Sequence, residues 1–184
     1  MTYNQENHHR RSLRLKEYDY RQAGAYFVNI VLQDRLCLFG EVIGTEIQLN
    51  EAGKMAGRIW KALSNRFPTI AIDTFVVMPN HLHGIIIINQ HRDHKSTVGA
   101  SLVDALPALG DVIGAYKSLT TVEYTRGVKM MKWKPFHRRL WQRNYYEHII
   151  RNDDSLNHIR QYIIDNPGQW AFDKENPLAT KAKT

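Results

Sequence analysis

Two apolar segments joined by a short turn restrict most strongly what this chain of 184 residues can fold into. Residues 70–78 and 81–88 are rich in Ile and Val, and Pro79 and Asn80 between them are suited to a tight turn. β-Branched runs of this length, bounded by turn residues, are typical of strands. The chain therefore contains at least two strands that follow each other directly, and the other elements must pack on them.

Three further stretches predict strands. Apolar side chains alternate over residues 25–33, as in a half-buried strand, and residues 41–49, bent at Gly44-Thr45, predict a hairpin. The run 141–150 also reads as a strand. The pattern breaks down over residues 89–108, which we interpret as a loop or linker.

Helical spacing appears in three places. Asn50 can cap a helix that runs to about Arg66, a second helix spans residue 109 to about residue 124, and the last spans residues 153–165. Strands and helices in this order predict an α+β fold, with an antiparallel sheet and helices packed on one face. This layout is ferredoxin-like or RNA-recognition-motif-like.

The composition fits one packed domain. The apolar share is 43%, and we expect a single domain over residues 1–184, ordered from about 10 to 177, with a flexible tail over 178–184. The longest aliphatic run is Ile85–Ile88, far short of the ~20 apolar residues of a membrane span. Cys37 is the only cysteine and no secretory signal is visible, so we expect a cytoplasmic protein without disulfides.

The charge distribution predicts a polyanionic partner. Lys and Arg total 25 against 18 Asp and Glu, a formal net charge of +7. The basic segment, residues 126–143, holds seven Lys or Arg and no acidic residue, interleaved with Trp133, Phe136 and Trp141. Cations that follow a backbone and aromatics that stack on bases are typical of single-strand binding. The alternative is a solvated loop whose aromatic side chains belong to the core.

His81 and His83 form a candidate metal site. Residues i and i+2 of a strand point the same way, so both imidazoles project from one face. Two neutral imidazoles can hold Mn²⁺ or Zn²⁺, and Mg²⁺ less comfortably. With nine histidines in the chain, chance alone supplies about 0.4 pairs at this spacing. On spacing alone, two partly exposed strand histidines are the favoured interpretation.

Tyr162 and Asn166 lie four residues apart near the end of the last predicted helix, and His158 lies one turn earlier. Side chains at this spacing share a helix face, so a phenol and an amide come together. Pro167 disfavours helical geometry at Asn166, which could instead be a C-terminal cap. Taken alone, Tyr162 could be an ordinary surface tyrosine.

Several motifs together resemble one family. Residues 76–84, VVMPNHLHG, resemble the His-hydrophobic-His motif of HUH single-tyrosine transposases. Residues 10–20, 140–152 and 160–167 are similar to the branch called REP-associated tyrosine transposases. The likeness runs from about Arg10 to Pro177 and omits only the linker at 89–108.

This resemblance implies both chemistry and partners. His81 and His83 match the metal-binding histidines, Asn166 the third ligand, and Tyr162 the nucleophile, which His158 could assist. It implies Mg²⁺ or Mn²⁺ and single-stranded DNA that folds as imperfect-palindrome hairpins. It also implies strand transfer through a 5′-phosphotyrosine. Monomer and homodimer both stay open. The residues expected to contact DNA are Arg10, Arg11, Arg14, Lys16, Lys132, Trp133, Lys134, Arg138, Arg139 and Arg143.

Two other classes stay open at this stage. A non-catalytic protein that binds nucleic-acid hairpins would need neither metal nor Tyr162. A metal-dependent hydrolase would need further carboxylate ligands, and none accompanies the histidine pair locally. Tyr145 and Tyr146 are rival nucleophiles, but neighbouring strand residues face opposite sides, so only one of them could reach the metal face.

Overall fold

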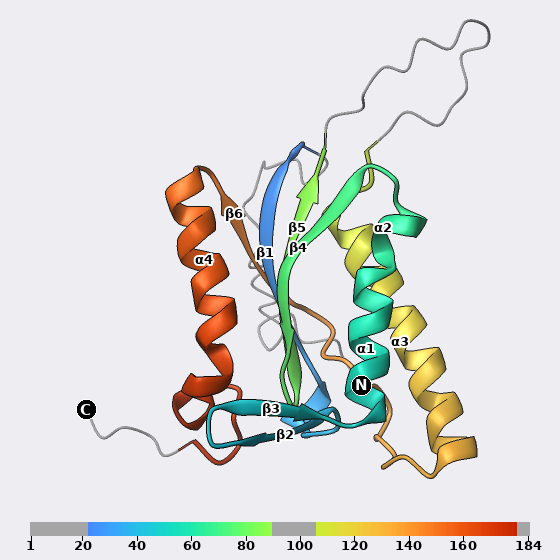
Figure 1. Ribbon diagram of the computed structural model, residues 1–184. Coiled ribbons are helices and arrows are strands. Elements are labelled where there is room, and N and C mark those ends of the chain that lie inside the picture. The colour runs from blue at the N-terminus through green and yellow to red at the C-terminus, as the bar shows by residue number, and fades with distance from the viewer. Residues whose placement is uncertain (1–21, 90–105, 180–184) are drawn as a thin grey trace, which may run out of the picture.

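The computed structural model describes residues 22–89 and 106–179 (Figure 1). Within these residues one antiparallel sheet has the strand order β4-β5-β1-β6, and a second pair of strands, β2 and β3, forms a separate hairpin. The strands are β1 (Gly24–Val31), β2 (Gly40–Ile43), β3 (Glu46–Leu49), β4 (Ile70–Val77), β5 (His81–Ile88) and β6 (Tyr146–Ile150). Gly44, with φ at +64°, supplies the left-handed turn of the β2–β3 hairpin.

The helices begin where polar side chains can cap them. The Asn50 side chain accepts a hydrogen bond from the Gly53 amide at 3.0 Å, and Asn152 does the same for Ser155 at 2.8 Å. The described helices are α1 (Glu51–Lys61), α2 (Leu63–Arg66), α3 (Leu109–Met131) and α4 (Asp153–Asp165), with 3₁₀ turns η2 (Gln33–Arg35) and η3 (Asn166–Phe172).

Both faces of the sheet are covered. On one face, Tyr26, Val28 and Ile30 of β1 join the main core, to which α1 and α3 contribute. On the other face, Phe27 and Ile85 pack with Ile163 of α4. Figure 1 accordingly shows α4 on one side of the sheet and α1 with α3 on the other.

The predicted α+β fold with an antiparallel sheet is confirmed. The helices, however, do not all pack on one face, because α4 lies opposite α1 and α3. The physical reason is that β5 carries apolar side chains on both faces, and each face needs a cover. The polar pair His81 and His83 lies on the α4 face of this strand.

Three predicted boundaries differ. Helix α3 continues to Met131, past the predicted end near residue 124, and the predicted helix from 50 to 66 is divided at Ala62. Strand β6 begins only at Tyr146, while Trp141 makes an isolated bridge with Leu32. Most of the predicted linker, residues 90–105, lies outside the described residues, as do 180–184 of the predicted tail. No helix in the described part of the chain is long and apolar enough to cross a membrane.

Candidate functional site

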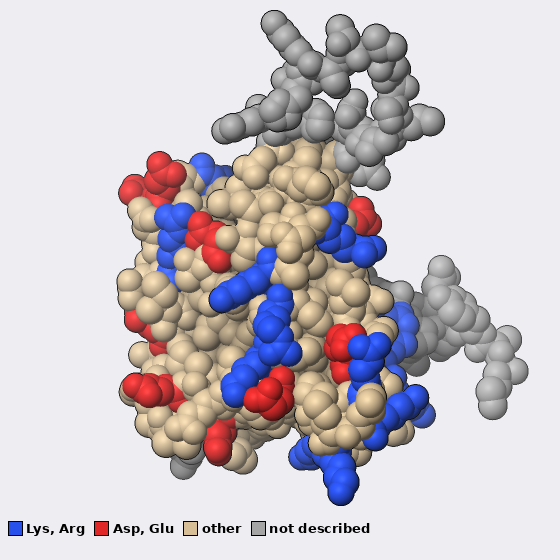
Figure 2. All heavy atoms as spheres, turned by 45° about the vertical axis from the view of Figure 1, so that its right-hand side comes forward, with Lys and Arg blue, Asp and Glu red and all other residues tan. Residues whose placement is uncertain are grey.

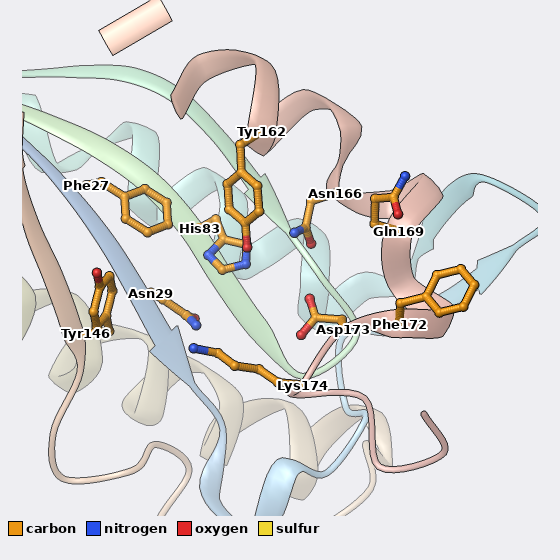
Figure 3. Close-up of a pocket in the computed structure, with 10 residues that line it drawn as sticks. All are labelled: Phe27, Asn29, His83, Tyr146, Tyr162, Asn166, Gln169, Phe172, Asp173 and Lys174. Atoms are coloured by element: carbon orange, nitrogen blue, oxygen red, sulfur yellow. The ribbon is translucent and has the colours of Figure 1, made fainter. Parts of the chain in front are cut away.

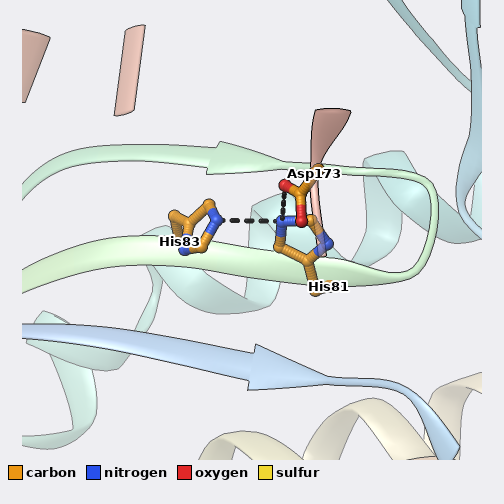
Figure 4. Close-up of side chains that lie close together, drawn as sticks. All are labelled: His81, His83 and Asp173. Carbon is orange, nitrogen blue, oxygen red and sulfur yellow. Dashed lines mark hydrogen bonds and ion pairs between the residues drawn. The ribbon is translucent and has the colours of Figure 1, made fainter. Parts of the chain in front are cut away.

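Strand β5 presents His81 and His83 to the α4 side of the sheet, while Leu82 between them belongs to the main core. Both imidazoles are buried, with 0% and 3% of their surface exposed. Figure 4 shows the two rings side by side, with Asp173 reaching over them from the chain that follows η3. The predicted pair therefore lies on one face, in a setting far drier than that of ordinary strand histidines.

Asn80, in the turn before β5, determines which nitrogen of His81 is free. Its amide nitrogen donates to the backbone carbonyls of Arg35 at 3.0 Å and Glu175 at 2.7 Å. Its oxygen must then face His81 Nδ1, which lies 2.8 Å away and carries the proton. The Nε2 atom of His81 is left with its lone pair, which is the form that binds a metal.

Electron-pair donors converge on this lone pair. His83 Nε2 lies 3.0 Å from His81 Nε2, and Asp173 Oδ2 lies 3.6 Å from it. Burial lowers the pKa of His81 to about 3 and that of His83 well below its usual value. Both rings are therefore neutral near pH 7, and the contact between His81 and Asp173 is not an ion pair at that pH.

These three side chains can hold a metal ion. Their ligand atoms all lie within 4.8 Å of one another, the one such group found among the described residues. Two ligands about 2.1 Å from one ion, at right angles, would be about 3.0 Å apart, which is the separation of the two Nε2 atoms. Two imidazoles and a carboxylate suit Mn²⁺ or Zn²⁺, and the carboxylate also suits Mg²⁺.

Asp173 was not predicted from the sequence. It lies 90 positions after His83, in a segment without helical or strand periodicity, so no local spacing connects the two residues. Burial raises the pKa of its carboxyl, with an opposing effect from its hydrogen bond with the Glu175 amide. Only the tertiary fold brings this acid to the histidines.

Tyr162 reaches the same site from α4. Its ring centroid lies 5.5 Å from that of His83 and 6.0 Å from that of Phe27. Its side chain faces a pocket of about 620 Å³, and 47% of the residue remains exposed. Partial burial, and then the charge of Asp173, raise the pKa of the phenol. The pocket, drawn in Figure 3, is lined by Phe27, Asn29, His83, Tyr146, Tyr162, Asn166, Gln169, Phe172, Asp173 and Lys174.

Asn166 lies at the junction of α4 and η3. It keeps helical angles, φ −56° and ψ −40°, although Pro167 follows, because Pro167 stands at the start of η3, where its missing N–H costs nothing. The residue is buried, and its side-chain oxygen has no hydrogen-bond partner in the described structure. Its amide influences the pKa values of His81, Tyr162 and Asp173, so it lies among all three.

An ion pair anchors the helix that carries Tyr162. Arg160 donates from Nη2 to Asp73 Oδ2 at 2.6 Å and from Nε to Asp73 Oδ1 at 3.0 Å. Asp73 lies where β4 departs from regular pairing with β5, between Ile72 and Phe75. The hydrogen bonds from Arg160 lower the pKa of Asp73 to about 2. This two-point contact ties α4 to the sheet two residues before Tyr162.

Comparison with known proteins relates the chain to one family. An uncharacterized protein of Haemophilus influenzae (strain Rd) is 38% identical over 179 residues, which cover 94% of this chain and 96% of the relative. A candidate REP-associated tyrosine transposase of the same bacterium is 25% identical over 159 residues, covering 84% and 76%. A solved REP-associated tyrosine transposase bound to a REP hairpin matches with TM-score 0.52 and 20% identity, covering 88% of this chain and 76% of that one. The chain is related to the REP-associated tyrosine transposases.

No protein-family model matches the chain. The predicted resemblance to REP-associated tyrosine transposases is nevertheless confirmed by the sequence match and by the shared fold. For the solved relative, the bound partner is a REP hairpin.

In this chain, a relative of the REP-associated tyrosine transposases, the remaining residues predicted for the site do not all lie in the pocket. His158 is exposed and does not line the pocket. Tyr146 lines the pocket, whereas Tyr145 packs against the main core and carries Lys117 Nζ 5.4 Å from its ring centroid. As the alternation of strand side chains predicts, only one of these two tyrosines reaches the metal face.

The basic segment divides by residue type. Its aromatic side chains pack into the protein: Trp133 lies against Tyr124 with ring centroids 5.3 Å apart, and buried Trp141 donates to Thr120 at 2.8 Å. Its cations stay in solvent, and those predicted to contact DNA are exposed: Lys132, Lys134, Arg138, Arg139 and Arg143. Arg10, Arg11, Arg14 and Lys16 lie outside the described residues.

Proposed function

We propose that this protein is a metal-dependent enzyme that nicks and rejoins single-stranded DNA at hairpin-forming repeats, through a 5′-phosphotyrosine on Tyr162. The observation that carries the proposal is the placement of the Tyr162 phenol beside a buried group of converging metal ligands, His81, His83 and Asp173. Family relationship to REP-associated tyrosine transposases supports the same reading.

Each residue of the site has a separate role in the proposed reaction. A divalent ion, Mg²⁺ or Mn²⁺, held by His81, His83 and Asp173 with Asn166 as a further oxygen ligand, would neutralise a non-bridging phosphate oxygen. Tyr162 attacks the phosphorus, and the bond from phosphorus to the 3′-oxygen breaks. The products are a 5′-phosphotyrosine and a free 3′-hydroxyl, and attack by a second 3′-hydroxyl reverses the step and joins strands.

The phenol must lose its proton as it attacks, because its pKa is raised above the usual value. Asp173 lines the same pocket, so the carboxylate oxygen that does not hold the metal can accept that proton. The departing 3′-oxygen takes a proton from water. His158 is not needed for either transfer in this arrangement, since it is exposed and away from the pocket lining.

The proposed substrate is a DNA hairpin with an unpaired flank. A relative with the same fold was solved with a REP hairpin, and the exposed cations of the basic segment supply charge for such a ligand. Tyr162 belongs to the same chain as the histidines of its pocket, so one copy can act alone and we propose a working monomer. We place the reaction in the cytoplasm.

The decisive experiment is a denaturing gel of labelled single-stranded hairpin DNA incubated with Mg²⁺ or Mn²⁺. Wild-type protein is expected to form a covalent adduct and to lose it in EDTA. Tyr162→Phe is expected to form none while still binding the hairpin, because only a hydroxyl is removed. Tyr146→Phe, the matched tyrosine of the same pocket, is expected to keep the adduct.

Other outcomes would redirect the assignment. Adduct loss only in Tyr146→Phe would move the nucleophile to β6. Cleavage without any adduct, ending in a free 5′-phosphate, would favour the metal-dependent hydrolase, to which Asp173 lends a carboxylate. Hairpin binding with no cleavage by the wild type would favour the non-catalytic binding protein.

A further inference from the structure

Two side chains of the pocket have no task in the proposed chemistry. Lys174 is exposed, lies directly after Asp173, and has its Nζ atom 5.7 Å from the centroid of the Tyr146 ring. Figure 3 shows the Lys174 side chain extending across the pocket from the chain that follows η3 toward β1, with its ammonium group close to Asn29. A cation and an aromatic ring thus stand together beside the Tyr162 phenol.

Lys174 acts on the site only through its charge. It helps to lower the pKa values of His81, His83 and Asp173, yet no hydrogen bond or ion pair connects it to a described residue. Its ammonium group is exposed in a pocket that also holds the Tyr162 phenol and the metal-ligand group, so it is available to an anion that enters this pocket.

Tyr146 offers a surface for a base. It is 44% exposed, and its ring makes a T-shaped contact with Phe27 at 6.2 Å between centroids, so the ring has a neighbour and part of it remains accessible. The pocket of about 620 Å³ falls within the roughly 300–1,000 Å³ of sites that enclose a drug-sized molecule. It is therefore large enough for a nucleotide and not only for a phosphate group.

The backbone beneath Lys174 is fixed on both sides. Asp173 Oδ1 accepts a hydrogen bond from the Glu175 amide at 2.7 Å, and the Glu175 carbonyl accepts from Asn80 at 2.7 Å. The Glu175 carboxylate also pairs with Arg35 at 2.8 Å. Only the side chain of Lys174 is left to move, so its ammonium group can exchange the Tyr146 ring for a phosphate without disturbing Asp173.

We propose that Lys174 and Tyr146 form a nucleotide subsite beside Tyr162, where the Lys174 ammonium group binds a backbone phosphate next to the scissile one and the Tyr146 ring stacks on the adjoining unpaired base. The inference rests on the proposed function, because it assumes that single-stranded DNA enters this pocket. It adds a definite nucleotide, bound through charge at one end and through stacking at the other.

The test compares hairpin oligonucleotides that each carry one methylphosphonate, which removes the charge of a single phosphate near the cut. Binding is measured in the Tyr162→Phe background, so that no chemistry intervenes. One methylphosphonate position is expected to weaken binding by about 10- to 100-fold, the loss of a charge-assisted hydrogen bond. With Lys174→Met added, the unmodified oligonucleotide should bind as weakly, and this methylphosphonate should cost nothing more.

A second arm replaces single nucleotides by abasic ones. Loss of the stacked base is expected to weaken binding by about 5- to 100-fold, and to have no further effect when Tyr146→Leu is present. Lys61→Met serves as the matched control, since Lys61 lies on α1, on the opposite face of the sheet, and should leave both patterns unchanged. Lys174→Arg should restore the phosphate pattern in part.

The two proposals can fail separately. The subsite is wrong if every methylphosphonate weakens binding by Lys174→Met as much as binding by its parent, and if every abasic site weakens binding by Tyr146→Leu as much as binding by its parent. That conclusion would hold even where wild-type protein forms its adduct. If the two patterns appear but wild-type protein forms no adduct, the subsite stands and the proposed chemistry fails.

Discussion

His83 and Asn29 lie directly opposite each other in the pairing of β5 with β1. Each has one buried polar atom without a hydrogen-bond partner in the described structure, Nδ1 of His83 and Oδ1 of Asn29. Side chains at opposed positions of an antiparallel pair have Cβ atoms about 4.5–5.5 Å apart, so the two atoms can meet after a small rotation. When Nε2 of His83 binds a metal, Nδ1 must carry the proton, and Asn29 is then its natural acceptor.

We therefore predict that Asn29→Ala weakens Mn²⁺ binding by about tenfold or more, the usual effect of losing a partner behind a metal ligand. Asn29→Asp should restore or increase the affinity, because a carboxylate accepts the same hydrogen bond. Calorimetric titration with Mn²⁺ measures both, and exposed Asn65→Ala is the control. Equal Mn²⁺ affinity in wild type and Asn29→Ala would show that His83 orients itself without this partner.

Helix α4 must be held both at a fixed distance from the sheet and at a fixed position along β5. Apolar contacts of Ile163 fix the distance to the sheet, but they are compatible with sliding along it. The pair between Arg160 and Asp73 is directional, with two hydrogen bonds in a fixed fork. We infer that this pair sets the position of the Tyr162 phenol along the pocket.

The corresponding prediction is that Arg160→Met slows adduct formation by at least about tenfold, while Mn²⁺ affinity and hairpin binding stay close to wild type. Since Arg160 is partly exposed and its ion pair is screened by solvent, the loss of stability should be small. Single-turnover kinetics, Mn²⁺ titration and thermal unfolding together separate positioning from folding. Arg160→Lys should recover only part of the rate, because one ammonium cannot reproduce the fork. An unchanged rate in Arg160→Met would refute the role.

The elements also show how far sequence reasoning reaches. The histidine pair and the Tyr162–Asn166 pair each follow a local period, two residues in a strand and four in a helix, so both could be predicted. Asp173 and Lys174 follow no period, because tethers from Asn80 and Arg35 to Glu175 place them. The fold class was predictable because periodicity indicates which residues form strands and helices and which faces are apolar. The packing of α4 was not predictable, because periodicity does not indicate which element covers each face.

For the whole molecule, positive charge lies on more than one surface. Figure 2 shows Lys and Arg side chains gathered on the side formed by the helices at the right of Figure 1. There, exposed Lys54, Arg58 and Lys61 follow one face of α1, whereas Arg138, Arg139 and Arg143 belong to the basic segment. The two triplets carry equal charge and provide a matched comparison.

We predict that neutralising Arg138, Arg139 and Arg143 to Gln weakens hairpin binding and flattens its salt dependence. The log–log slope should change by roughly 0.7 for each lost contact with a single strand. Neutralising Lys54, Arg58 and Lys61 removes the same net charge and should change the slope less. Equal slopes for the two triple variants would mean that binding responds to overall charge and not to the basic segment.

The buried histidines make stability of the metal-free protein depend on pH. Their folded pKa values lie below the unfolded value near 6.5, that of His81 at about 3, so the unfolded chain binds more protons in this range. The free energy of unfolding therefore does not depend on these histidines above about pH 6.5. Below that pH it falls, by at most about 1.4 kcal/mol per pH unit for each histidine. The raised pKa of Asp173 opposes this in part at the acid end.

Urea unfolding in EDTA at pH 7.5, 6.5 and 5.5 measures this dependence. Below pH 6.5, His83→Gln should give a shallower loss than wild type, because one buried ring no longer has to stay neutral. Exposed His148→Gln should keep the wild-type slope. A parallel loss in all three proteins would assign the pH effect to other groups.

Because side chains alternate along β5, neighbouring residues of this strand have different roles. Leu82, Gly84 and Ile86 turn toward the main core, where a Cβ on Gly84 would come within 2.7 Å of the Trp60 ring. His81 and His83 turn toward the pocket. In a saturation library over this strand, changes at 82, 84 and 86 should reduce the amount of protein in the cell. Among substitutions by polar residues of similar or smaller size, changes at 81 and 83 should instead leave abundant protein that cannot cleave. Within that class, the even-numbered and odd-numbered positions of the strand should show different defects.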